Sequence, residues 1–251
     1  MIADAAEAKR IENLLLNATQ PAQQLQFDGW LLRLAHNDVK RASSVNAAYG
    51  SSLPLDEKIE HCKRVYAENG LPPLFRVTPF SKPAGLDEAL AARGYDRFER
   101  TLCMSAALPE TPAATRQDLR FERPHLRRWL DAAAELRGLS NERRRAEYER
   151  LFESALPGFS LIAWLGDKPV ACGLTMIEDD YAGLFDVCTS EALRGQGIGT
   201  ALCVELLRTA RLHGTGRAWL SVLDDNTPAL RMYEKLGFRP VYDYWYRRQP
   251  S

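Results

Sequence analysis

The chain has 251 residues, of which 45% are hydrophobic and 26% are charged, so it can bury a core in one or two globular domains. Its 33 basic residues balance its 33 acidic residues, which gives no electrostatic reason to expect nucleic acid or an anionic membrane as a partner. No apolar run has the length of a membrane span and no signal-peptide pattern opens the chain, so we expect a cytoplasmic protein.

The five cysteines and four histidines show no spacing typical of disulfide frameworks or metal sites. The cysteines are scattered and odd in number, which indicates buried thiols in a reducing compartment. The histidines lie far apart in the sequence. We therefore predict that the protein holds no metal.

The first part of the chain mixes strand and helix patterns up to a proline-containing segment. Gly70, Pro72 and Pro73 end one helical pattern, and residues 108–117 have the composition of a linker. This organisation predicts a domain at 1–107, a linker at 108–117 and a second domain at 118–251. Before the linker we expect helices at 5–16, 55–68 and 86–93 and strands at 27–35, 41–49, 74–78 and 100–106.

After the linker, a turn at residues 166–169 joins two strands of an antiparallel meander. The mixed charges of residues 141–145 indicate a solvated helix face and not a basic patch. In this part we expect strands at 119–122, 161–165, 170–177, 181–189, 217–223 and 242–246, with helices at 124–136 and 141–154 and from residue 198 onward.

The chain is organised around residues 181–212, where a strand leads through a glycine-rich loop into an amphipathic helix. Glycines let the backbone turn tightly and approach a ligand, and the first amides of a helix favour an anion. We predict that this loop holds phosphate, with an ordinary tight turn as the alternative. Thr200 stands where a dinucleotide motif needs its third glycine, and the lysine of a Walker A loop is missing.

A second motif follows the strand at 217–223. Asn226 or Thr227 can cap a helix that Pro228 starts and Gly237 ends. Asn226 and Tyr233 are seven residues apart, which is two helical turns, so we expect them to share one face of that helix.

Together the two motifs resemble the GNAT-type N-acetyltransferase superfamily. Arg194-x-x-Gly197-x-Gly199 matches its acyl-CoA loop, and the segment from Asn226 to Phe238 matches its N-x-x-A-x-x-x-Y-x-x-x-G-F element. The resemblance implies a mixed α/β (α+β) fold, the GNAT acyl-CoA N-acyltransferase fold, with a central mixed, mostly antiparallel sheet and flanking helices. It also implies acetyl-CoA as co-substrate.

The resemblance further implies roles for single residues. Tyr233 would be the general acid, and Asn226 would bond to the pantetheine or phosphate arm of the coenzyme. The base is open among acidic residues at 178–180 and 186, of which we retain Glu178 and Asp186. The other residues expected to bind the coenzyme are Val187, Cys188, Thr189, Arg194, Gly195, Gln196, Gly197, Ile198, Gly199 and Thr200.

The first half resembles a partial, degenerate copy of the same fold. Placing Gly94-Tyr95 on Gly237-Phe238 puts Leu90 at the position of Tyr233, and the loop at 50–54 lacks the arginine and the paired glycines. We therefore predict a tandem arrangement in which the N-terminal half binds coenzyme A poorly.

The predicted function is acyl-CoA-dependent N-acyl transfer, with acetyl as the expected group, to a primary amine by direct attack in a ternary complex. The alternative is a non-catalytic acyl-CoA-binding regulatory module. A nucleotide-dependent oxidoreductase has only Asp224 in its favour, and the antiparallel meander argues against it. A small-molecule or peptide amine acceptor, and a monomer or a homodimer, are all compatible with the sequence.

Overall fold

A computed structural model describes residues 4–50, 52–109, 116–140, 142, 151 and 154–250. The chain forms two compact units. The first comprises Met1–Cys103, Ser221–Asn226 and Pro240–Ser251, and the second comprises Met104–Leu220 and Thr227–Arg239. Three strands, β5 (Asp96–Ala107), β10 (Arg217–Leu223) and β11 (Arg239–Arg248), contribute residues to both. The domain boundaries inferred from the sequence stay a prediction.

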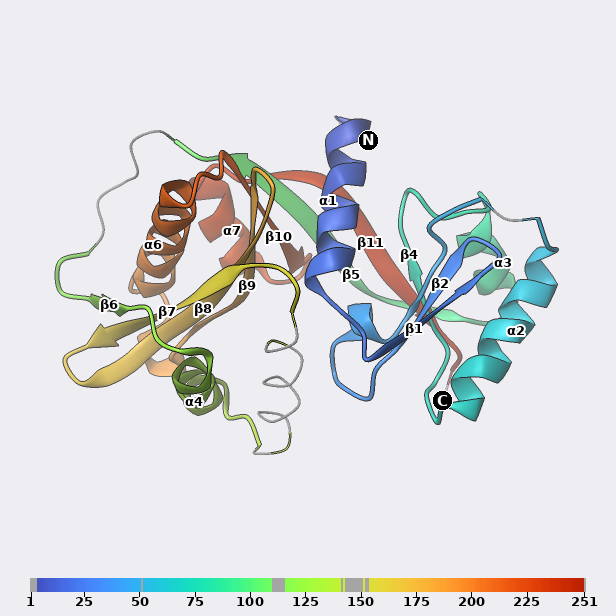
Figure 1. Cartoon of the computed structure of the whole chain (residues 1–251), viewed down its shortest axis with the longest axis horizontal. Coiled ribbons are helices and arrows are strands. Elements are labelled where there is room, and N and C mark those ends of the chain that lie inside the picture. The colour runs from blue at the N-terminus through green and yellow to red at the C-terminus, as the bar shows by residue number, and fades with distance from the viewer. Residues whose placement is uncertain are drawn as a thin grey trace. The chain divides into compact units, whose positions relative to one another are not determined.

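The first unit has strands in the order β1-β2-β3-β4-β11, and only the pair β3–β4 is parallel (Figure 1). Its core gathers large buried side chains that include Trp30, Tyr66 and Phe75. The elements of this unit are α1 (Ala5–Ala18), β1 (Gln23–Phe27), β2 (Trp30–Leu34), η1 (Lys40–Ala42), β3 (Val45–Asn46), α2 (Leu55–Glu68), β4 (Leu74–Val77), α3 (Leu86–Ala92) and most of β11 (Arg239–Arg248).

The second unit has strands in the order β10-β9-β8-β7-β6, and only the pair β9–β10 is parallel. Hairpins join β7 to β8 and β8 to β9, as the predicted meander requires. The elements of this unit are β6 (Arg120–Glu122), α4 (Leu126–Arg137), β7 (Gly158–Leu165), β8 (Lys168–Glu178), β9 (Tyr181–Thr189), η2 (Glu191–Leu193), α6 (Ile198–Leu212) and α7 (Thr227–Lys235).

Helices α6 and α4 cover opposite faces of the strands β7 to β9 (Figure 1). A Cβ on Gly173 of β8 would meet Leu206 of α6 at 3.0 Å and Val187 of β9 at 3.4 Å. Cys188 follows Val187 in β9, and its sulfur lies 3.9 Å from the Leu136 carbonyl of α4. Since successive strand residues point to opposite faces, the two helices enclose the sheet. The predicted mixed, mostly antiparallel sheet with flanking helices is confirmed.

The strand predicted at 27–35 is wrong at its start, because a hairpin turn divides the predicted range and β2 begins at Trp30. Asp28 and Gly29 form a two-residue turn between β1 and β2, and Phe27 pairs with Trp30 across it. Both turn residues have positive φ, 39° for Asp28 and 81° for Gly29, as the favoured tight hairpin loops require.

The strand predicted at 41–49 is also wrong over most of its length. Only Val45 and Asn46 form a strand, and a 3₁₀ turn covers Lys40–Ala42. Small residues such as those at 42–44 have weak strand preference, so tertiary contacts decide their conformation. The Arg33 side chain donates to the Arg41 carbonyl at 3.0 Å and holds this turn. The helix predicted at 141–154 lies almost wholly outside the described residues.

No helix in the described part of the chain combines the length and the apolar character of a membrane span. All five cysteines are free thiols; four are buried and Cys188 is half-buried.

Candidate functional site

Strand β9 separates from β10 after three paired residues. Tyr181, Ala182 and Gly183 pair with the first three residues of β10, and β9 then continues to Thr189 without a partner in β10. The side chains from Phe185 to the end of β9 are only half-buried. Unpaired backbone groups at a strand edge accept an extended ligand, so this part of β9 offers peptide-like hydrogen bonds.

A β-bulge lies at the point where β9 runs on alone. Cys172 pairs with Cys188 and Leu174 with Phe185, so two residues of β9 oppose Gly173 of β8. Asp186, inside the bulge, has a φ of 50°. A bulge bends a strand and redirects its groups, and such irregularities concentrate next to active sites.

The two predicted bases lie on neighbouring strands, Glu178 on β8 and Asp186 on β9. The Asp186 carboxylate is inside the bulge, 3.7 Å from a guanidinium nitrogen of Arg137 at the end of α4. Glu178 ends β8 and pairs with Tyr181, five residues before Asp186. At roughly 3.4 Å per residue, this separation is about 17 Å along the strand. The structure therefore does not bring the two carboxylates together.

The glycine loop after β9 is open to solvent. Gly195 and Gly197 both have a φ of 78°, the left-handed conformation that favours glycine, and residues 194–197 are exposed. Gly197 precedes α6, whose N-terminus has no side-chain cap. The first amides of α6 are thus free for an anion.

The loop is anchored on its inner side. Ile198 is buried at the start of α6, and the guanidinium of Arg116 donates to the Gln196 carbonyl at 2.5 Å. The Arg194 side chain is 65% exposed and lies 3.5 Å from Glu191, a surface pair that leaves its charge available.

Gly199 allows the strand end, α6 and α7 to approach closely. A Cβ at this position would lie 3.0 Å from the Thr189 hydroxyl and 3.4 Å from the Met232 sulfur. A larger residue would therefore require the Thr189 or Met232 side chain to shift. The neighbouring Thr200 is half-buried.

Tyr233 lies on α7 and is 7% exposed, with its ring 5.8 Å from that of Phe238. Burial, with the nearby Cys203 thiol, raises the pKa of the Tyr233 phenol well above its usual value. The Tyr233 phenol is therefore protonated at neutral pH and is a weaker acid than a free tyrosine. Asn226 is exposed immediately before α7.

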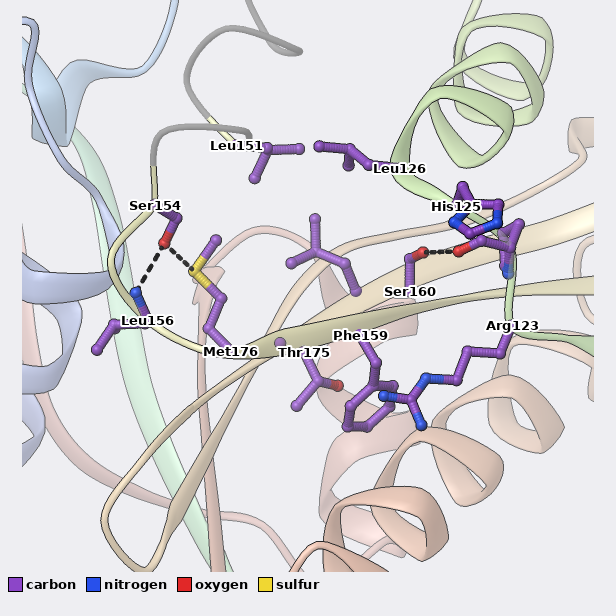
Figure 2. A pocket seen from close by; sticks show the side chains of 13 residues that line it. Arg123, His125, Leu126, Leu151, Ser154, Leu156, Phe159, Ser160, Thr175 and Met176 are labelled. Atoms are coloured by element: carbon purple, nitrogen blue, oxygen red, sulfur yellow. Dashed lines mark hydrogen bonds between the residues drawn. The ribbon is translucent and has the colours of Figure 1, made fainter.

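A cavity of about 360 Å³ opens in the second unit where α4, β7 and β8 meet (Figure 2). Its β8 side is formed by residues 174–176, which pair with the section of β9 just before the bulge. The Thr175 hydroxyl is buried there without a hydrogen-bond partner. Ser160 donates to the Pro124 carbonyl at 3.4 Å, and Ser154 lies between the Leu156 amide and the Met176 sulfur. The sequence did not reveal this cavity, because its lining comes from separate segments without a motif.

In the part of the chain that the structure describes, no group of three or more histidine, cysteine, aspartate or glutamate side chains is arranged to hold a metal ion.

The profile of the acetyltransferase (GNAT) family matches residues 121–238. The chain is 30% identical over 247 residues to the uncharacterized N-acetyltransferase YobR of Bacillus subtilis (strain 168), covering 96% of this chain and 98% of YobR. The fold is similar to that of a GCN5-related N-acetyltransferase from Kribbella flavida, with a TM-score of 0.72, 19% identity and coverage of 97% and 95% of the two chains. It is also similar to a tandem GNAT protein from the clavulanic acid biosynthesis pathway, with a TM-score of 0.59, 17% identity and coverage of 76% and 69%.

The sheet, the flanking helices and the relatives define a transferase of the N-acetyltransferase class. The chain belongs to the acetyltransferase (GNAT) family.

Proposed function

We propose that this enzyme transfers an acetyl group from acetyl-CoA to a primary amine, with both substrates bound at once. The observation that carries the proposal is the separation of β9 from β10, followed directly by the open loop and the uncapped start of α6. The unpaired edge of β9 suits the amide groups of pantetheine, and the amides of α6 suit a pyrophosphate.

In this proposal, residues 187–189 hold the pantetheine arm and polarise the thioester carbonyl through their backbone N–H groups. The loop residues 194–200 and the side chain of Asn226 hold the phosphates and the arm. The close approach of Thr189 to Gly199 fixes the distance between the two parts of the site.

The reaction needs one proton removed and one supplied. The amine nitrogen attacks the thioester carbonyl, the C–N bond forms and the C–S bond breaks, and the sulfur takes a proton from Tyr233. A base accepts the proton that the amine loses. Asp186 lies in the bulge and Glu178 at the far end of the β8–β9 hairpin. Loss of the base should shift the pH–rate profile toward alkaline pH, so Asp186→Asn and Glu178→Gln should differ in the size of this shift.

The cavity on β7 and β8 is the proposed acceptor site, for a small-molecule or peptide amine. It lies beside the section of β9 that precedes the bulge, and it combines apolar walls with hydroxyl groups and the side chains of Arg123 and His125.

A non-catalytic acyl-CoA-binding module is the alternative. A binding module has no need of a buried, protonated tyrosine beside the coenzyme, so Tyr233 favours the enzyme. Thiol release from acetyl-CoA, measured with a broad panel of amines, distinguishes the two. Tight binding of acetyl-CoA without turnover on any amine would favour the module.

We also propose that the first half is a degenerate copy of the second. In both, a parallel pair of strands is joined by a long helix: β3 and β4 by α2, and β9 and β10 by α6. The fold similarity to a tandem GNAT protein supports the same interpretation.

The next helix of each half ends in the same way. The Tyr95 amide donates to the Leu90 carbonyl at 3.1 Å, and the Phe238 amide donates to the Tyr233 carbonyl at 3.0 Å. The glycines before these aromatic residues, Gly94 and Gly237, both have positive φ, 79° and 91°. Leu90 thus occupies the place of the tyrosine.

In the first half, a carboxylate accepts hydrogen bonds from the backbone amides before the long helix. Asp28 accepts from the Ser52 amide at 3.0 Å and from the Leu53 amide at 2.9 Å, just before α2. The corresponding amides of the second half lie beside the open loop. An internal side chain thus replaces the phosphate, which supports the proposal that this half binds coenzyme A poorly.

A further inference from the structure

The interior of the first unit contains more cationic side chains than carboxylates. Lys58 is fully buried and pairs with Asp28 at 3.1 Å. Arg76, 1% exposed, donates to both oxygens of Glu12 at 2.5 and 2.8 Å. These two cations have their counter-ions. A buried charge without such compensation opposes folding, so the remaining arginines need an explanation.

Arg33 is compensated by carbonyl groups. Its guanidinium donates to the carbonyls of Leu16 at 2.9 Å, Arg41 at 3.0 Å and Thr19. Leu16 and Thr19 lie at the C-terminal end of α1, where the helix dipole is negative. Arg33 therefore caps α1 and needs no carboxylate.

The half-buried Arg41 has neither kind of compensation. One terminal nitrogen donates to the Tyr244 hydroxyl at 3.1 Å, and its Nε, like those of Arg33 and Arg76, is buried without a hydrogen-bond partner. Among the described residues, no carboxylate forms an ion pair with Arg41. The nearby Glu99 carboxylate is bound to Lys40 at 2.9 Å.

A cavity of about 280 Å³ in the first unit is lined by Arg41. Four residues with hydroxyl groups, Thr101, Ser221, Tyr244 and Tyr246, are also among its lining residues. Its volume is just below the range of about 300–1,000 Å³ typical of small-molecule pockets. The cavity thus offers a cation, hydroxyl donors and space for a small ligand.

We propose that this cavity is a binding site for a small monocarboxylate, held by the guanidinium of Arg41. A planar guanidinium matches a carboxylate through two parallel hydrogen bonds. A single uncompensated cation suits a singly charged ligand, while Asp38 and Glu99 on the same cavity oppose a phosphate dianion. The apolar groups of Val39 and Leu223 accommodate a short hydrocarbon body. None of its lining residues belongs to the proposed acetyl-CoA site, so this proposal does not depend on that one.

The test is a calorimetric titration of the full chain with sodium benzoate, without coenzyme A. Benzamide, which has the same shape without the charge, is the matched ligand control, and sodium chloride matches the ionic strength. We expect saturable 1:1 binding of benzoate, at least about tenfold tighter than benzamide, since hydrogen bonds to charged groups are the stronger class. No benzoate binding, equal affinity for benzamide, or tighter binding of inorganic phosphate would overturn the proposal.

Two variants locate the site. Arg41→Met should weaken benzoate binding at least about tenfold. Arg247→Met should leave it unchanged, because the Arg247 guanidinium already has Asp87 as its carboxylate partner, at 2.8 and 3.0 Å. Thermal melting shows whether each variant folds. If Arg41→Met does not fold, Arg41→Lys is the test. A lysine lacks the planar guanidinium, so benzoate should bind several-fold more weakly. Benzoate binding at the wild-type level would contradict the proposal.

Discussion

Tyr233 is the proposed proton donor for a leaving thiolate. Its buried phenol holds its proton at neutral pH, while the raised pKa makes it a weaker acid than a free tyrosine. Tyr233→Phe removes only the hydroxyl and preserves the ring contact with Phe238. We expect kcat to fall by about 10²- to 10⁴-fold, the usual contribution of a positioned acid, with acetyl-CoA affinity nearly unchanged. Steady-state kinetics and calorimetry measure the two quantities.

Tyr95→Phe is the matched control for this substitution. The Tyr95 hydroxyl is buried in the first unit without a hydrogen-bond partner. Tyr95→Phe removes the same atom as Tyr233→Phe, at a position far along the chain from the proposed catalytic residues. Turnover should stay at the wild-type level in this variant. Full activity of Tyr233→Phe would remove Tyr233 from the mechanism.

Asp28 is the second residue with a testable electrostatic role. The backbone N–H groups of Leu53 and Ser52 hold the pKa of its carboxyl well below the usual range. A lowered pKa in the folded state means that the charged form stabilises the fold above the unfolded pKa of about 3.9. This stabilisation is lost as the pH falls through the folded pKa.

Asp28→Asn should therefore lower the melting temperature at pH 7, and the difference from wild type should narrow as the pH falls below about 4. Asp167→Asn, in the exposed turn between β7 and β8, should leave the melting temperature unchanged. The melting temperatures of both variants and the wild type are compared in melting curves recorded between about pH 3 and pH 7. A difference for Asp28→Asn that does not change with pH would contradict the assigned role.

Among the elements, the two ends of α6 allow a matched comparison. Gly197 precedes the helix with a φ of 78°, and Gly214 follows it with a φ of 92°. A Cβ at either position meets nothing within 4 Å, so an alanine strains only the backbone, by about 1–2 kcal/mol. Gly197→Ala and Gly214→Ala should lose similar stability.

Only Gly197→Ala should weaken acetyl-CoA binding, by about tenfold or more, because it disturbs the amides that would hold the pyrophosphate. Calorimetry of both variants, with melting curves for stability, tests this expectation. Equal loss of affinity in the two variants would show that general destabilisation, and not the loop, is responsible.

Elements with local start and stop signals were predictable. The helix Leu55–Glu68 and the strands Tyr181–Thr189 and Arg217–Leu223 have the predicted bounds, because prolines, glycines or a change of pattern mark their ends. The start of the strand predicted at 27–35 was wrong. Apolar residues on both sides of Asp28-Gly29 suggested one continuous strand, although this dipeptide itself favours a turn. The residues at 41–49 depend on the distant Arg33 side chain, which no local pattern shows.

The candidate site also has parts that local sequence motifs predict and parts that depend on distant contacts. The glycine loop and Tyr233 belong to contiguous motifs, so the sequence locates them. The cavity on β7 and β8 joins segments from residue 123 to residue 176, and the Asp28 carboxylate reaches an amide 24 positions along the chain. Such contacts exist only in the folded molecule. The separation of Glu178 from Asp186 likewise became visible only with the register of β8 and β9.

At the scale of the whole molecule, the proposed tandem arrangement implies different occupants at corresponding amides of the two halves. In the first half the Asp28 carboxylate fills the position, and in the second half the loop is open. We therefore predict one coenzyme site in this chain.

The most direct test is a calorimetric titration of the intact chain with acetyl-CoA. We predict one acetyl-CoA per chain, with affinity reduced in Gly197→Ala and unchanged in Gly214→Ala. No binding, or two equivalent sites per chain, would contradict the account.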